Sequence, residues 1–389
     1  MGMTEVLDDY STLQNPLMRG VKSINDRPLP SPKDLELPAG TEVISADDHW
    51  AITEDIFYEN FPAHLRDQAP RVWYDGYWRI GKSGGREVFT ADPRIQNAVL
   101  KANLRTAWVH ETRRQHLAAE GISKEIVYPQ SLLGYFDPNP EVRSWVYRTY
   151  NEYIAEQNRK NPSFFGVGLF SNWWEQARVD EAMEQIVTLG LKGVLVPVSL
   201  KDGENKEISY ADPIMDRFWD VVGESGLPVC FHIGEPFNLQ GRGAMAATTM
   251  MGIAPFRKPL SQIVFGGVLD RHPNQQIVFA EGGIGWVLPW LQDAEALYDT
   301  YREIIEPIDH RPSHYWRNNC GATFQADALG LSRLDILGAD RVMWASDYPH
   351  TEGTFGFSAA VMKSIVDQVG EATAKLILGG NANRFFFRA

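Results

Sequence analysis

Short apolar runs rich in β-branched and aromatic residues recur along the chain after Gly40, and stretches with helical periodicity lie between them. Each run has the length of a strand and is followed by polar or glycine residues. We predict eight strands, at Val43–Ala46, Ile126–Pro129, Phe164–Leu169, Gly193–Val198, Pro228–Gly234, Gln276–Ala280, Tyr315–Asn318 and Arg341–Ser346.

The segments between the strands predict helices. Pro140–Lys160 begins with Pro-Glu and carries apolar residues at helical spacing, and Trp174–Leu189 ends at Gly190, a residue type that stops helices. The other predicted helices are Ile214–Glu224, Leu260–Asp270, Val287–Ile305, Ala326–Leu337, Phe357–Val369 and Ala372–Leu378, the last stopping at Gly379-Gly380.

Alternating strands and helices predict an α/β fold, a (β/α)8 TIM barrel over residues 41–389. An open doubly wound sheet would also alternate. Its usual glycine-rich phosphate turn after the first strand is missing, because Ser45-Ala46-Asp47-Asp48-His49 stands there.

Two segments depart from the alternation. Residues 1–40 predict an extended N-terminal arm, because five prolines interrupt any helix. Residues 50–125, between strands one and two, predict an inserted cap or lid over the strand ends. This insertion holds a Ser83-Gly84-Gly85 turn and the aromatic residues Trp73, Tyr74, Tyr77, Trp78 and Trp108.

Composition narrows the class of protein. The 389 residues carry a net charge of 37 − 50 = −13, which argues against nucleic acid and anionic membranes as partners. No stretch approaches the roughly 20 apolar residues of a membrane helix.

Two distant cysteines, Cys230 and Cys320, without a secretory signal at the N-terminus, predict a cytoplasmic protein. Twelve tryptophans and the proline-rich arm fit a homo- or hetero-oligomer.

Polar residues follow several apolar runs directly. In a parallel barrel the carboxyl ends of the strands meet, so these side chains are expected to converge. Asp47 and His49, two positions apart on extended backbone, share one face. The set of candidate site residues is Asp47, His49, His232, Glu281, Asp347 and His350.

Histidine and carboxylate are the ordinary ligands of Zn²⁺, Mn²⁺ and Fe²⁺, and a catalytic site needs about three of them plus an open position. Four residues, Asp47, His49, His232 and Asp347, predict such a site. Glu281 and His350 are a surplus: they serve either as acid–base groups or partners around one metal, or as ligands of a second metal. Asp48 is expected to cap a helix or to pair with a basic side chain.

The segments Ser45–His49, Phe231–Gly234, Glu281–Trp286, Ala345–His350 and Gly379–Phe385 resemble the amidohydrolase superfamily. The similarity is to the branch that includes aminocarboxymuconate semialdehyde decarboxylase and the resorcylate decarboxylases, and it runs in order from about residue 41 to the C-terminus.

The resemblance implies that Asp47, His49, His232 and Asp347 bind the metal. Three departures qualify it. The leading position of strand one is Asp rather than His or Glu, strand six carries Glu281 where many relatives place a His, and Gly193–Val198 has no lysine at its end for a carbamate bridge. An oxygen-rich ligand set suits Mn or Fe at least as well as Zn.

We therefore expect a metal-dependent enzyme that acts on a small carboxylate-bearing molecule. The metal would polarise a substrate oxygen or lower the pKa of a bound water from about 15.7 towards about 7, and Asp347 would move protons, with Glu281 and His350 as further catalytic groups. Hydrolysis and non-oxidative decarboxylation both use this apparatus. The alternatives are a dinuclear Fe/Mn oxygenase on the same barrel and a non-catalytic subunit of a hetero-oligomer.

Overall fold

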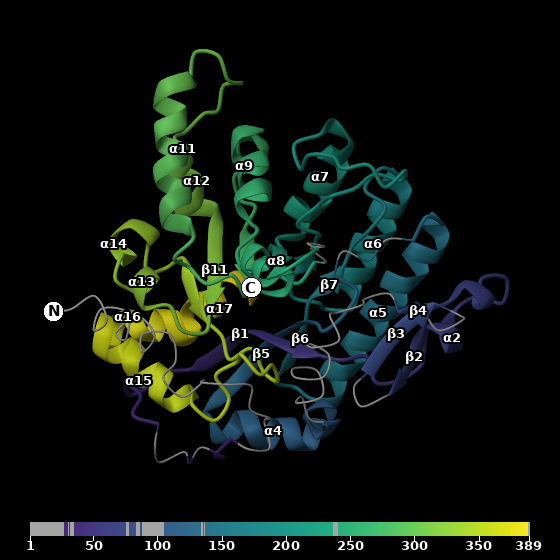
Figure 1. Ribbon diagram of the computed structural model, residues 1–389, viewed down its shortest axis with the longest axis horizontal. Coiled ribbons are helices and arrows are strands. Elements are labelled where there is room, and N and C mark those ends of the chain that lie inside the picture. Colours follow the sequence, from purple (N-terminus) through teal and green to yellow (C-terminus); the bar gives the residue numbers. More distant parts are fainter. Residues whose placement is uncertain are drawn as a thin grey trace.

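The computed structural model describes residues 27–29, 31, 35–74, 78–82, 86–87, 105–133, 135, 137–235 and 240–387. Figure 1 shows strands in the middle of the molecule with helices around them. The parallel strands are β1 (Val43–Trp50), β5 (Ile122–Pro129), β6 (Phe164–Gly166), β7 (Gly168–Leu169), β8 (Val194–Leu195), β9 (Val229–His232), β10 (Ile277–Ala280), β11 (Cys320–Phe324) and β12 (Val342–Trp344).

These strands form two parallel sheets, in the orders β1-β5-β6 and β7-β8-β9-β10-β11-β12. One residue separates the sheets along the chain: the Val167 N–H donates to Val127 O at 3.0 Å, whereas the Gly168 N–H donates to Gly193 O at 2.9 Å. The segment after β12 lies against β1, where the Asp347 N–H donates to Asp47 O at 2.9 Å. The predicted parallel α/β architecture is confirmed, and the strands in the described part of the chain form no continuous ladder that closes a barrel.

The predicted helix at Pro140–Lys160 is confirmed as α5, whose start is capped by the Asn139 side chain accepting from the Glu141 N–H. The remaining helices of the αβ units are α6 (Gln176–Thr188), α7 (Asp216–Ser225), α8 (Ala244–Gly252), α9 (Arg257–Phe265), α10 (Val268–Arg271), α11 (Val287–Tyr301), α12 (Pro312–Asn319), α13 (Ala328–Leu331), α14 (Leu334–Leu337), α15 (Ser358–Val369), α16 (Glu371–Lys375) and α17 (Asn381–Phe386).

The predicted seventh strand at Tyr315–Asn318 is wrong, because that segment is part of α12. Pro312 opens the helix at a position that favours it, and Tyr315 and Trp316 are buried on its inner face. The strand is β11, five residues further on, whose residues Cys-Gly-Ala-Thr-Phe carry a weaker strand signal.

The predicted helix stop at Gly379-Gly380 is also wrong. A π-helical turn over Leu376–Gly380 joins α16 to α17. Gly379 is needed for packing: a Cβ there would lie 2.1 Å from Glu42 O, so only glycine lets this turn approach β1.

The described part of the insertion contains α2 (Ile56–Asn60), the antiparallel strands β2 (Arg71–Tyr74), β3 (Trp78–Lys82) and β4 (Arg86–Glu87), and α4 (His110–Ala119). Two short 3-10 turns, at Arg66–Gln68 and Arg105–Trp108, connect them. Tyr77 and the Ser83–Gly85 turn lie outside the described residues, as does most of the arm. The division into arm, cap and barrel stays a prediction.

None of the helices in the described part of the chain combines the length and apolar character needed to cross a membrane. Cys230 and Cys320 are buried and free. The cytoplasmic location and the oligomeric state stay predictions.

A buried ion pair supports β1 from below in the view of Figure 1, where α4 lies under β1 and β5. Arg113 of α4 and Glu125 of β5 are both fully buried, and the Arg113 Nε donates to the two Glu125 oxygens at 2.9 and 2.8 Å. Arg113 Nη1 also donates to His49 O at 2.9 Å. The guanidinium therefore ties α4, β5 and the end of β1 together.

We predict that Arg113→Met lowers the free energy of unfolding by about 3–5 kcal/mol, because it leaves the Glu125 carboxylate buried without its partner. Urea unfolding followed by circular dichroism measures this. Arg114→Met is the matched control: Arg114 is half-exposed on the same helix and forms a surface ion pair with Glu111, so its loss should cost less than about 1 kcal/mol. Equal costs for the two variants would contradict the role given to Arg113.

Candidate metal centre

The structure brings all six predicted site residues together at the carboxyl ends of the strands. Asp47 and His49 lie on β1, and His232 is the last residue of β9. Glu281 follows β10 directly, and Asp347 and His350 follow β12. The side chains of the first three residues and of Asp347 are almost completely buried.

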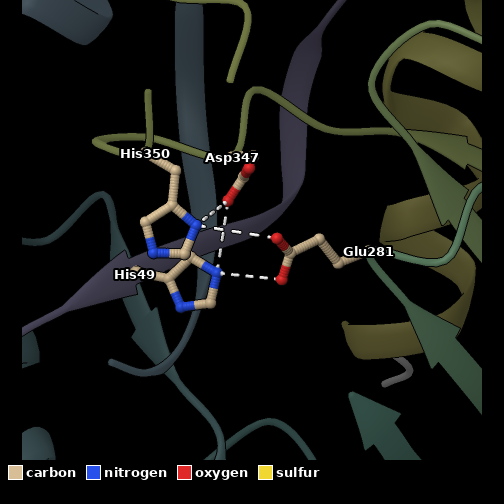
Figure 2. A group of neighbouring side chains, drawn as sticks. All are labelled: His49, Glu281, Asp347 and His350. Atoms are coloured by element: carbon tan, nitrogen blue, oxygen red, sulfur yellow. Dashed lines mark ion pairs between the residues drawn. The ribbon is translucent and has the colours of Figure 1, made fainter. Parts of the chain in front are cut away.

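The ligand-type atoms form two groups that share His49: Asp47, His49 and His232 in one, and His49, Glu281, Asp347 and His350 in the other. Figure 2 shows the second group, with the two imidazole rings stacked and both facing the two carboxylates. Within the groups, His232 Nε2 lies 3.3 Å from Asp47 Oδ1, and Asp347 Oδ1 lies 3.2 Å from His49 Nε2 and 2.8 Å from His350 Nδ1.

These spacings fit atoms that bind a common cation. Ligand atoms held about 2.1 Å from one ion lie roughly 3.0–3.4 Å from each other in octahedral or tetrahedral geometry. Several of the atoms also have no hydrogen-bond partner among the residues that the structure describes: both ring nitrogens of His49, both oxygens of Asp347 and Nδ1 of His350. Buried polar atoms without a partner are costly, and a bound cation would satisfy those that face it.

Two of the histidines are held in the tautomer that a ligand needs. His232 Nδ1 lies 2.7 Å from Ile233 O, and His350 Nε2 lies 2.9 Å from Gln130 Oε1. Because each of these oxygens accepts, the facing nitrogen carries the proton. When the ring is neutral, as a metal ligand must be, the other nitrogen, Nε2 of His232 and Nδ1 of His350, has a lone pair directed at the carboxylates.

Thr323 of β11 belongs to the centre and was missed by the sequence prediction. Its hydroxyl donates to Asp47 Oδ2 at 3.2 Å and accepts from the Glu281 N–H at 2.8 Å, so it fixes a carboxylate of the first group and the backbone of a residue in the second. Because the seventh strand was predicted at Tyr315–Asn318, Thr323 was not expected near a strand end. Its only sequence signal is a single hydroxyl residue in an otherwise apolar strand.

Asp48 caps no helix. Its Oδ1 accepts from Ser45 Oγ at 2.8 Å and from the Tyr348 N–H at 2.9 Å, and the charge of Arg113 lies near it. Asp48 thus holds the segment after β12 against β1, behind the centre.

Backbone strain is concentrated here as well. Glu281 has φ 63° and Asp347 has φ 57°, in the left-handed region that side chains with a Cβ rarely adopt. Hydrogen bonds from both backbone N–H groups, to Thr323 Oγ1 and Asp47 O, hold these conformations. Strain of this kind is typical of functional sites, where the surrounding structure imposes the geometry.

Burial and neighbouring charges shift the pKa values of the cluster. Burial raises the pKa of Asp347 to about 6, with the Glu281 charge acting in the same direction. Burial and the neighbouring His350 lower the pKa of His49 to about 4. For His232, burial would lower the pKa, but the adjacent Asp47 carboxylate outweighs it and raises the value to about 9. Without a cation, imidazolium charge therefore balances part of the carboxylate charge.

The loop after His350 is anchored by Arg27, which lies in the predicted N-terminal arm. Arg27 is buried, and its Nη1 donates to Gly353 O at 2.8 Å and Phe355 O at 3.1 Å, while Nη2 donates to Thr351 O. Glu120, at the end of α4, accepts from the Gly356 N–H at 2.7 Å. Two buried polar side chains from distant parts of the chain, Arg27 and Glu120, thus hold the loop that carries the last site residues.

The chain matches the family model described as amidohydrolase over residues 128–388, and it therefore belongs to the amidohydrolase family. The family resemblance inferred from the motifs is confirmed, and with it the expectation of an enzyme.

A curated relative is 2-amino-3-carboxymuconate-6-semialdehyde decarboxylase of Dictyostelium discoideum, which is 22% identical over 294 residues, or 72% of this chain and 76% of the relative. A solved amidohydrolase from Mycobacterium avium subsp. paratuberculosis K-10 has a TM-score of 0.69 at 18% identity, covering 90% of this chain and all of the other. A 5-carboxyvanillate decarboxylase from Novosphingobium aromaticivorans, solved with manganese and 4-hydroxy-3-methoxy-5-nitrobenzoic acid, has a TM-score of 0.61 at 18% identity, covering 92% and 99%. At these identities the solved structures show a shared fold.

We predict that Glu120 makes stability depend on pH. Burial raises its pKa from an ordinary value of 4.5 to about 8, against the lowering effect of the Gly356 N–H. Between these values the folded protein keeps a proton that the unfolded chain releases, so stability is lost as the pH rises from about 4.5 to about 8 and is constant above.

Glu120→Gln should remove this contribution, which is on the order of a few kcal/mol. Urea unfolding at about pH 5 and about pH 8 compares the two proteins, with Glu184→Gln, an exposed position on α6, as the control. An identical pH dependence in wild type and Glu120→Gln would contradict the prediction.

Proposed function

We propose that the protein is a metal-dependent, non-oxidative decarboxylase of a small organic molecule that bears a carboxylate. The observation that carries the proposal is the buried cluster of histidines and carboxylates with unpartnered atoms at the strand ends. The decarboxylases among the relatives, one of them solved with manganese, support it. We also propose that the two parallel sheets close into one barrel, since hydrogen bonds join Asp47 and His49 to the segment after β12.

Asp47, His49, His232 and Asp347 would hold a divalent cation. A bound Zn²⁺, Mn²⁺ or Fe²⁺ supplies Lewis acidity, which polarises a substrate oxygen next to the carboxylate that leaves. Manganese is the first metal to test, because the oxygen-rich donor set suits it.

The chain's own groups would orient the substrate and move a proton. In decarboxylation the bond between the substrate carbon and its carboxylate breaks, the electron pair stays on the substrate carbon, and CO₂ leaves. That carbon then takes a proton. Asp347 is the proposed donor, because its carboxyl is buried and neither oxygen has a hydrogen-bond partner among the described residues.

A second candidate is an oxygenase with two Fe or Mn ions. The contact of Glu281 and His350 with the other four residues favours it, because a hydrolase or decarboxylase with one metal does not need six ligands. Turnover without dioxygen separates the two candidates: a decarboxylase continues to release CO₂, and an oxygenase stops.

We predict that His232→Ala loses bound metal and activity together, with activity falling by at least about 100-fold. Metal content is measured by inductively coupled plasma mass spectrometry, and activity by CO₂ release from a panel of aromatic and unsaturated carboxylates that carry a neighbouring oxygen or nitrogen. His64→Ala is the control, since His64 is exposed and its side chain forms an ion pair with Glu141, away from the cluster. A His232→Ala variant with full metal content, or an active wild-type protein free of metal, would refute the proposal.

A further inference from the structure

The cluster offers more ligand atoms than one cation needs. A single catalytic metal takes about three protein ligands and keeps an open position, whereas six side chains meet here. The surplus is not a set of remote supporting groups, because Glu281 and His350 present unshielded ligand atoms to the same space as the other four.

Glu281 directs its two oxygens at different histidines, as Figure 2 shows. Its Oε2 lies 3.1 Å from His232 Nε2 and 3.6 Å from His49 Nε2, and its Oε1 lies 3.6 Å from His350 Nδ1. A carboxylate whose two oxygens face different histidines has the arrangement of a bridge between two ions.

The stacked rings of His49 and His350 indicate a suitable spacing. Their centroids are 4.0 Å apart with an interplanar angle of 21°, and Figure 2 shows His49 Nε2 and His350 Nδ1 on the same side, facing Glu281 and Asp347. Near-parallel rings thus offer two ligand nitrogens side by side. The ions of two-metal sites are about 3.5–4 Å apart, which matches one imidazole for each ion.

We propose that this centre holds two divalent cations bridged by Glu281, an inference that rests on the proposed function as a metal enzyme. Asp47, His49, His232 and Glu281 Oε2 bind the first ion. Asp347 and His350, whose nearest ligand atoms are 2.8 Å apart, would bind the second together with Glu281 Oε1, so with two ions Asp347 leaves the set given above for one ion.

The net charge of the cluster also favours two bound cations. With the histidines neutral as ligands, the carboxylates of Asp47, Glu281 and Asp347 carry three negative charges in a buried space. One divalent cation leaves a net charge of −1, and two leave +1. A positive remainder attracts the carboxylate of the proposed substrate, whereas a negative one repels it.

A substitution at Gln130 tests the second ion without changing any of the proposed ligands. Gln130 follows β5 and accepts from His350 Nε2, which keeps the lone pair of Nδ1 directed at Glu281 and Asp347. Gln130 is therefore a positioning residue for the second ion alone. Partners of this kind typically contribute 10–100-fold to metal affinity.

The experiment uses the full chain, stripped of metal by a chelator and dialysed against Mn²⁺ at increasing concentration. Bound manganese per chain is counted by mass spectrometry, and low-temperature electron paramagnetic resonance reports magnetic coupling between ions. We expect about two Mn²⁺ per wild-type chain with a coupled spectrum. Glu281→Gln should bind about one, with the hyperfine pattern of an isolated ion.

Gln130→Leu should weaken the second Mn²⁺ about 10–100-fold and leave the first unchanged. His350→Ala is a second variant that tests the same prediction should Glu281→Gln fail to fold. It should also bind about one Mn²⁺ per chain. Glu141→Gln and His64→Ala, an exposed Glu–His pair, are the matched controls and should keep two.

The outcomes separate the two proposals. A wild-type chain that saturates at one Mn²⁺, or a coupled pair that persists in Glu281→Gln, would overturn the two-ion centre and leave a metal enzyme in place. A wild-type chain that binds no Mn²⁺, Zn²⁺ or Fe²⁺ would overturn the proposed function as well.

Discussion

The centre of this protein depends on the cost of removing charge from water. Three carboxylates and three imidazoles lie within contact distance of one another at the carboxyl ends of the strands, and several of their atoms have no hydrogen-bond partner in the described part of the chain. A buried, unpaired carboxylate is strongly destabilising. Imidazolium charge balances part of this carboxylate charge, and the proposed cations would neutralise the cluster more fully and provide Lewis acidity.

The rest of the fold holds the proposed ligands close together. Arg113 and Glu125 fix the end of β1, and Asp48 joins β1 to the segment after β12. Arg27 and Glu120 hold the following loop. Each support is itself a buried charged or polar group with specific partners, so the ligands are positioned by a network rather than by apolar packing alone.

The six candidate residues could be predicted from the sequence because most of them closely follow an apolar run, where a polar side chain is unexpected. The sequence also predicted the parallel α/β architecture and the exact bounds of α5, where Asn139, Pro140 and the apolar spacing agree. Local sequence patterns gave the wrong secondary structure where tertiary contacts determine it. Tyr315 and Trp316 resemble strand residues but are the buried face of a helix, and Gly379 packs against Glu42 instead of ending one.

The residues that orient the site residues could not be predicted from the sequence, for a different reason. Gln130 meets His350 across 220 positions, and Arg27 reaches Gly353 across 326, so no local pattern identifies either pair. Thr323 was hidden by the misplaced strand. A ligand is visible in a sequence because its type is rare at a strand end, whereas a residue that orients a ligand can be of any polar type.

Anomalous X-ray diffraction from crystals grown with Mn²⁺ would decide whether the cluster binds metal, because it locates the ion and its ligands at once. We predict anomalous density enclosed by Asp47, His49, His232, Glu281, Asp347 and His350. Well-ordered side chains in that cluster, bonded only to water and to each other with no anomalous density between them, would contradict it.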